Sequence, residues 1–292
     1  NRIVKSGAPR LGPFTSRADA IRSRIESTVR RAPQVMVKVT GGGRGMKTIA
    51  AHLRYISKNG QLQIEDDRGV VEQGRDVLRD IERQWQYDGA FIDDIGHRRE
   101  AFNVMLSMPK GTDPLIVQKA AREFAKIEFA NHRFVMVLHT HQANPHVHLS
   151  VKAESMHGER LNPRKADLQR WRETFAERLR EWGIDAEATR QAVRGAVRNY
   201  PDLWRKKAAE EGREREPRPE RKVGTAALAN RRDAGQAWAT IAAALGASPD
   251  PKDKRLALDI ERFVTGRVLS RSVVREQARL PPEPQRDIGR SR

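Results

Sequence analysis

Two neighbouring segments near the middle of the chain alternate apolar and polar residues, and they constrain the fold more than any other feature. RFVMVLHT (133–140) and HVHLSVKA (146–153) each have the period of two that is typical of a β-strand. Only a short polar loop separates them, so they most simply form an antiparallel hairpin. Further strands are predicted over 34–40 and 101–108.

Helical patterns are mixed with these strands without strict alternation. Helices are predicted over 16–31, 46–60, 70–87, 113–130, 165–182, 185–198, 225–245 and 253–270. Such a mixture predicts an α+β fold, with an antiparallel sheet, flanking helices and a helical C-terminal segment.

The charge of the chain is large and uneven. The 292 residues include 56 Lys and Arg against 38 Asp and Glu, a net charge of +18. Residues 1–60 carry +11, residues 61–200 sum to zero and residues 201–292 carry +7. A pI near 10.8 indicates a polyanionic partner, most simply nucleic acid, although an excess of Arg could also serve solubility.

The expected domains follow this charge distribution. They are a basic N-terminal helical extension (1–33), a central domain (34–200) and a basic, helical C-terminal region (201–292) that contains a charged tract at 205–222 and a disordered tail. Because the chain begins at Asn1 rather than Met, the natural N-terminus could lie upstream.

Several classes of protein are excluded by composition. The chain has no cysteine, which excludes a disulfide scaffold, a thiolate metal site and a Cys nucleophile. No apolar run is long enough to span a membrane, and we expect no secretory signal. An acidic cluster, Glu65, Asp66 and Asp67 followed by Asp93 and Asp94, is interpreted as a solvated loop or helix start rather than a second metal site.

Four histidines lie close together in LHTHQANPHVHL, namely His139, His141, His146 and His148. Side chains two apart on a strand share a face, so the hairpin would place His139 opposite His146 and His148. Three imidazoles suit Mn²⁺, Zn²⁺, Co²⁺ or Ni²⁺, and they leave coordination positions open for catalysis. The alternative is a His-rich loop without metal, and we favour the metal site.

Tyr55 lies on a basic predicted helix, beside Arg54 and near Lys58. Taken alone, a tyrosine here is more typical of a core aromatic. Beside a metal cluster, however, its phenol could attack a phosphate, since a metal and nearby cations would lower the pKa of the phenol and stabilise the transition state.

GGGRGMKT (41–48) fails the P-loop pattern because Met46 separates the last glycine from the lysine. Its backbone amides could approach a DNA phosphate, or it could be a plain turn between strand and helix. Four basic side chains are predicted DNA contacts, with solvated surface charge as the alternative, and they are Arg44, Lys47, Arg54 and Lys58.

Three blocks together resemble the tyrosine relaxases of the P-type mobilisation (MOBP) group, which includes the T-DNA border endonucleases. The first is VKVTGGG…HLRYISKNGQL (37–62), similar to the motif that bears the nucleophilic tyrosine. The second is NVMLSMPKGTD (103–113), and the third is VLHTHQANPHVHLSVKA (137–153), which resembles the metal-binding motif of the HUH endonuclease fold. The resemblance spans about residues 34–185.

This resemblance implies residue roles. Tyr55 would be the nucleophile, and His139, His146 and His148 would bind a divalent metal, with Mg²⁺ or Mn²⁺ favoured over Zn²⁺, Co²⁺ or Ni²⁺. Many members carry an acidic residue where this chain has His141. His141 could act as a general base or be a spectator, and we assign it the catalytic role.

The implied function is that of a mobilisation nuclease in bacterial conjugation. It would nick one strand at a plasmid origin of transfer and form a 5′-phosphotyrosyl adduct. The implied partners are single-stranded DNA, relaxosome accessory proteins and a type IV coupling protein, without membrane insertion. The protein would act in the donor cytoplasm and could travel to the recipient with the DNA. Alternatives are an HUH replication initiator or transposase, or a non-enzymatic origin-binding protein. Many initiators place the histidines before the tyrosine, whereas Tyr55 comes first here.

Overall fold

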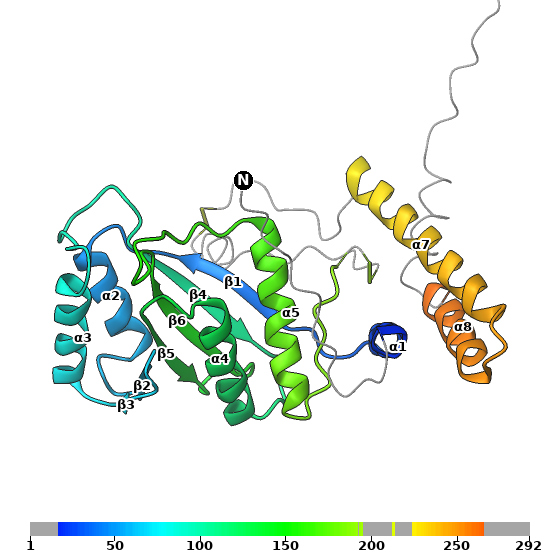
Figure 1. Cartoon of the computed structure of the whole chain (residues 1–292), viewed down its shortest axis with the longest axis horizontal. Coiled ribbons are helices and arrows are strands. Elements are labelled where there is room, and N and C mark those ends of the chain that lie inside the picture. The colour runs from blue at the N-terminus through cyan, green and yellow to red at the C-terminus, as the bar shows by residue number, and fades with distance from the viewer. Residues whose placement is uncertain (1–16, 192, 195–211, 214–223, 266–292) are drawn as a thin grey trace, which may run out of the picture. The chain divides into compact units, whose positions relative to one another are not determined.

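The computed structural model describes residues 17–191, 193–194, 212–213 and 224–265 (Figure 1). The chain divides into two compact units, one ending at Ala188 and the other beginning at Thr189.

A six-stranded sheet, with the spatial order β1-β4-β6-β5-β2-β3, forms the centre of the first unit. The strands are β1 (Met36–Gly41), β2 (Ile64–Asp66), β3 (Val71–Glu72), β4 (Ala101–Ser107), β5 (Phe134–His139) and β6 (His146–Lys152). Every neighbouring pair is antiparallel, and β5 and β6 form the predicted hairpin. The prediction of an α+β fold with an antiparallel sheet is confirmed.

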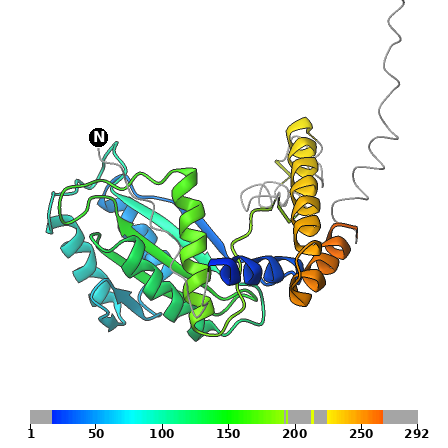
Figure 2. The ribbon, with the colours of Figure 1, turned by 45° about the vertical axis from the view of Figure 1, so that its right-hand side comes forward.

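The described residues of this unit form five helices, namely α1 (Arg17–Val29), α2 (Met46–Ile56), α3 (Arg75–Tyr87), α4 (Pro114–Glu128) and α5 (Lys165–Glu181). Helices α4 and α5 pack on one face of the sheet, where Phe124 and Phe175 join the apolar side chains of β4, β5 and β6 (Figures 1 and 2). Helices α2 and α3 pack against the opposite face of β5, through Val135 and Val137.

The alternation of β5 and β6 decides which face carries the histidines. Val147, Leu149 and Val151 are buried in the core under α4 and α5. The intervening residues of β6, His146 and His148, therefore point to the face on which α2 lies. The strand pattern thus brings the histidine cluster and the helix that bears Tyr55 to the same side of the sheet.

The short β2–β3 hairpin was not predicted from the sequence. Val71 and Glu72 pair with Glu65 and Ile64, so the helix predicted over 70–87 begins only at Arg75. The prediction that the acidic cluster is solvated is wrong for Glu65, which is 2 % exposed and pairs with Arg122 of α4.

Asp66 and Asp67, which follow Glu65 in the acidic cluster, also have arginine partners. Asp66 pairs with Arg68, and Asp67 lies 2.9 Å from Arg133. A carboxylate whose charge is neutralised by a guanidinium is a weak metal ligand. The arginine partners therefore account for the negative charge of Glu65, Asp66 and Asp67 without a bound metal.

The helix predicted over 185–198 is also wrong where it is described. Gly183, with φ of 80°, follows the end of α5, and residues 185–191 are not helical. Glu187 instead forms a parallel bridge with Gln34 beside β1, and it is buried 3.6 Å from Arg180. Burial raises the pKa of Glu187. Residues 195–198 lie outside the described residues.

Within the described part of the second unit the helices are α7 (Thr225–Gly246) and α8 (Pro251–Phe263). They pack together through an edge-to-face contact between Trp238 and Phe263. Both helices were predicted. Most of the tract 205–222 and all residues beyond 265, including the predicted tail, lie outside the described residues. None of the described helices is long and apolar enough to cross a membrane.

Candidate active site

The β5–β6 hairpin brings three histidines together. His139 pairs directly with His146 in the strand register, and His148 lies opposite Val137. One ring nitrogen from each of His139, His146 and His148 lies within 4.8 Å of the others, close enough for the three to hold a metal ion. The sequence predicted this convergence, and the role of the three as ligands stays a prediction.

Hydrogen bonds fix which ring nitrogens face the cluster. Nε2 of His139 lies 2.6 Å from the carbonyl oxygen of Ile56, and Nδ1 of His146 lies 2.9 Å from that of Asn144. A nitrogen that donates to a carbonyl carries the proton, so in both rings we assign the free lone pair to the other nitrogen.

The protonation of the cluster also suits a metal. Burial lowers the pKa of His148 to about 3 and lowers the pKa of His139 as well. Both rings are therefore uncharged at neutral pH, which is the form that binds metal. Three convergent imidazoles fit a divalent transition metal, and Mg²⁺ fits them less well.

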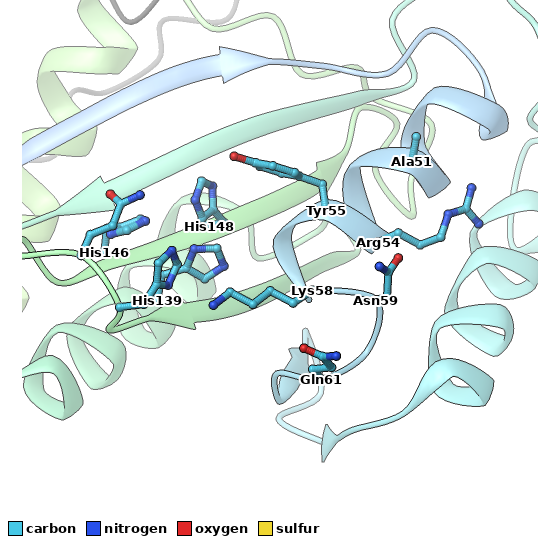
Figure 3. Close-up of a pocket in the computed structure, with 11 residues that line it drawn as sticks. Ala51, Arg54, Tyr55, Lys58, Asn59, Gln61, His139, His146 and His148 are labelled. Atoms are coloured by element: carbon cyan, nitrogen blue, oxygen red, sulfur yellow. The ribbon is translucent and has the colours of Figure 1, made fainter.

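Tyr55 lies in the last turn of α2 and points away from the core. Ile49, Leu53 and Ile56 form the buried stripe of this helix, whereas the side chain of Tyr55 is 73 % exposed. Figure 3 shows its ring extending from α2 over the strands toward the histidines. The alternative that Tyr55 is a core aromatic is therefore wrong.

The helix predicted over 46–60 ends early, at Ile56, in a left-handed turn. Lys58, Asn59 and Gly60 have φ of 51°, 57° and 82°. Asn59 N donates to Arg54 O over 2.7 Å, and the buried Ser57 hydroxyl accepts from Gly60 N. Left-handed conformations cost about 1 kcal/mol for residues other than glycine and are concentrated at functional sites. This turn directs the side chain of Lys58 toward the histidines (Figure 3).

Tyr55 and the histidines line one open pocket of about 660 Å³. Its lining residues are Ala51, Arg54, Tyr55, Lys58, Asn59, Gln61, His139, His141, Gln142, His146 and His148. The structure therefore brings Tyr55, Arg54, Lys58 and His141 together with the three candidate ligands.

The predicted DNA contacts differ in their surroundings. Arg54 forms an ion pair with Glu82 of α3, at 2.8 and 3.2 Å. Arg44 and Lys47 are exposed but do not line the pocket, because they lie at the opposite end of α2 from Tyr55.

The glycine-rich turn is explained as a plain turn between strand and helix. The amides of Met46 and Lys47 donate to the carbonyls of Asp93 and Asp94, over 2.9 and 3.1 Å. A Cβ on Gly45 would lie 2.5 Å from Asp94 O, so glycine is needed for the close approach of two backbones. Because these helix-terminal amides already have partners, the structure gives no support to the alternative in which they hold a phosphate.

His52 was missed by the sequence analysis. Its ring centroid lies 6.4 Å from that of Tyr55 and 6.5 Å from that of His148. Burial lowers its pKa to about 4, and its Nε2 atom is buried without a hydrogen-bond partner in the described part of the chain. The three-residue spacing to Tyr55 on one helix was the available signal.

His141 lies at the mouth of the cluster. It is exposed, and its ring centroid is 5.0 Å from that of His139. The structure thus places an accessible imidazole in the lining of the pocket, and its role as a base stays a prediction.

Comparison with known families adds to this geometry. Residues 55–184 match the family described as Relaxase, MobA/VirD2-like, nuclease domain. This part of the chain is a relaxase nuclease domain of that type. The family predicted from the sequence is confirmed, and the matched segment runs from Tyr55 to just beyond α5.

Curated relatives agree with this assignment. The chain is 26 % identical over 183 residues to the T-DNA border endonuclease VirD2 of Rhizobium radiobacter, and 25 % identical over the same length to those of Agrobacterium fabrum and Rhizobium rhizogenes. Each alignment covers 56 % of this chain and 41 to 43 % of the relative. The chain therefore matches under half the length of these relatives.

Proposed function

We propose that this relaxase domain nicks one strand of DNA through attack of Tyr55 on a phosphodiester. The observation that carries the proposal is that one pocket holds an exposed tyrosine and three convergent imidazoles. The carbonyl oxygen of Ile56, the residue after Tyr55, accepts a hydrogen bond from His139. The nucleophile and the cluster are therefore held by one helix end.

The proposed reaction exchanges one ester bond for another. The Tyr55 hydroxyl oxygen forms a bond to phosphorus, and the bond from phosphorus to the 3′ oxygen breaks. His141 takes the phenol proton, and the departing 3′ oxygen gains a proton from solvent. The products are a 5′-phosphotyrosyl adduct and a free 3′-OH. Because an ester is conserved, the strand can be rejoined by the reverse reaction.

Positive charge around the phosphate supports this step. A divalent metal held by His139, His146 and His148 would offset the negative charge that develops on the phosphate oxygens. Lys58 contributes a second positive charge from the end of α2. We propose Mg²⁺ or Mn²⁺ as the metal, and the all-imidazole donor set keeps Zn²⁺, Co²⁺ and Ni²⁺ as alternatives.

The proposed substrate is single-stranded DNA at a plasmid origin of transfer. The matched relatives are named T-DNA border endonucleases, and Tyr55 precedes the histidines, which favours a relaxase over an HUH initiator or transposase. We further propose action in the donor cytoplasm with relaxosome proteins and a type IV coupling protein, and passage to the recipient with the DNA. The catalytic domain would span residues 34–200, between the basic regions 1–33 and 201–292.

A nicking assay tests the proposal. Supercoiled plasmid carrying the transfer origin of the encoding element is incubated with Mn²⁺ or Mg²⁺, and protein-linked DNA is counted on a denaturing gel. Tyr55→Phe should abolish the adduct, whereas Tyr87→Phe, a control at another exposed tyrosine outside the pocket, should retain it.

Each other outcome of this assay has a distinct meaning. An adduct with Tyr55→Phe would refute the nucleophile, and full activity in EDTA would refute the metal. Absence of any adduct with the unaltered chain would favour an accessory DNA-binding protein. Nicking without a transfer origin would favour an initiator.

A further inference from the structure

We infer that His52 is a positioning residue for the metal centre, holding the imidazole of His148 and thereby setting the affinity of the site for metal. This inference rests on the proposed metal-assisted function. It concerns a residue that neither binds metal nor attacks DNA in the proposed mechanism.

The three candidate ligands differ in how their rings are held. A histidine that binds metal usually donates its second ring N–H to a partner, which fixes the ring. His139 has the Ile56 carbonyl as that partner, and His146 has the Asn144 carbonyl. For His148, Nδ1 is buried and has no hydrogen-bond partner in the described part of the chain. Nε2 of His148 is then the atom that is left to face the pocket.

A matching polar group lies beside the unpartnered nitrogen of His148. Nε2 of His52 is likewise buried and unpartnered among the described residues. The two rings face each other nearly edge to face, with centroids 6.5 Å apart and planes at 73°. His52 is therefore a ring with an unsatisfied nitrogen that packs directly against His148, the candidate ligand whose Nδ1 has no hydrogen-bond partner among the described residues. The inferred role is that a hydrogen bond between the two rings would satisfy both nitrogens when the site is loaded.

The helix that carries His52 links it to the nucleophile. His52 comes three residues before Tyr55 and four before Ile56, so on α2 it is a neighbour of both residues. Through this turn, α2 contacts His148 by the His52 ring and His139 by the Ile56 carbonyl. The same turn positions Tyr55. Through His52, the orientation of the His148 ring therefore depends on the position of α2, the helix that carries Tyr55.

Metal titration of matched variants tests the inference without DNA cleavage. The full chain is stripped with EDTA and titrated with Co²⁺, and affinity and the visible absorption bands are recorded for wild type, His52→Gln, His52→Asn and His52→Leu. Gln can place an amide near the position of Nε2, whereas Asn places one near Nδ1 and Leu keeps only bulk. We expect Gln to retain most of the affinity, and Asn and Leu to lose about 10- to 100-fold with altered bands. His97→Leu, at an exposed histidine outside the pocket, should behave as wild type.

The possible outcomes distinguish failure of the inference from failure of the proposed function. If wild type binds Co²⁺ and all three His52 variants bind it equally well, His52 only fills space and the inference is wrong. If Leu prevents folding, equal affinity of the Gln and Asn variants leads to the same conclusion. If wild type binds no Co²⁺ at all, the metal role in the proposed function fails, and this inference fails with it.

Discussion

The two ends of α2 have similar basic sequences but different surroundings. At the N-terminal end, near Arg44 and Lys47, the backbone amides bond to the carbonyls of residues 93 and 94, and Gly45 packs against that segment. At the C-terminal end, Tyr55 is exposed, the chain turns through left-handed residues, and a backbone carbonyl bonds to His139. One end attaches the helix to the fold, and the other forms the pocket. Charge density alone did not distinguish them.

The largest effect is expected from the histidines beside the C-terminal end. His148→Ala removes one of the three proposed ligands, so Co²⁺ affinity should fall by more than about 100-fold, the upper range for loss of a group that only orients a ligand. His97→Ala is the matched control and should change affinity little. Isothermal titration of the EDTA-stripped protein measures both. Unchanged Co²⁺ affinity of His148→Ala would show that the three histidines do not form the metal site proposed beside the C-terminal end of α2.

A substitution at the N-terminal end of α2 should change the stability of the protein rather than metal binding or DNA cleavage. In Gly45→Ala the new Cβ would meet Asp94 O at 2.5 Å, and we expect a loss of about 2 kcal/mol in the free energy of unfolding from the forced backbone shift. Gly235→Ala, within α7 and with open space around it, should be neutral or slightly stabilising. Urea unfolding compares the two variants. Equal stability of both would show that the Gly45 contact does not constrain the helix.

Acid should weaken the metal-free protein through the C-terminal end. The folded pKa values of His52 and His148, about 4 and about 3, lie below the ordinary 6.5 because burial disfavours the charged ring. Below pH 6.5 the unfolded chain therefore binds more protons than the folded one. The stabilising contribution of these two groups is complete above pH 6.5 and decreases as the pH falls toward 4.

Allowing for partial solvent access, we expect these two histidines to account for about 2 kcal/mol between pH 6.5 and 4.5. Urea unfolding in EDTA at both pH values measures the change. The double variant His52→Gln, His148→Gln should show a smaller decrease. If its pH dependence equals that of the wild type, the two rings are not the source.

The smallest effect is expected from charge reversal, which compares the two ends directly. Lys58→Glu places a negative charge in the pocket and should weaken binding of single-stranded DNA about tenfold at low salt. Lys47→Glu, at the far end of α2, should weaken it less. Fluorescence anisotropy with a labelled oligonucleotide gives both affinities. A larger loss for Lys47→Glu would place the DNA path along the glycine-rich turn instead.

The sequence predicted best where one local pattern was sufficient. Alternation over 133–153 established the hairpin, and the hairpin established the meeting of His139 with His146. The order of the motifs gave the family before the fold was known. These features depend on residues close together in the sequence.

The features that the sequence did not predict depend instead on residues that are far apart in the sequence. Glu65 is buried because Arg122, 57 residues later, supplies its partner, and no local pattern in a run of acidic residues reveals this. Strands β2 and β3 have only three and two residues, too few for periodicity to show. His52 gains its importance from the ring of His148 on a distant strand. Long-range partners, rather than local propensity, decided these positions.

Mass spectrometry of the trapped DNA adduct tests the central claim most directly. After reaction with an oligonucleotide that contains the nick site, trypsin cleaves after Arg54 and Lys58 and releases the peptide YISK (55–58). We predict that this peptide carries the 5′-phosphate end of the cleaved strand, linked through Tyr55. An adduct on Tyr87, Tyr200 or any other residue, or cleavage without a covalent adduct, would contradict it.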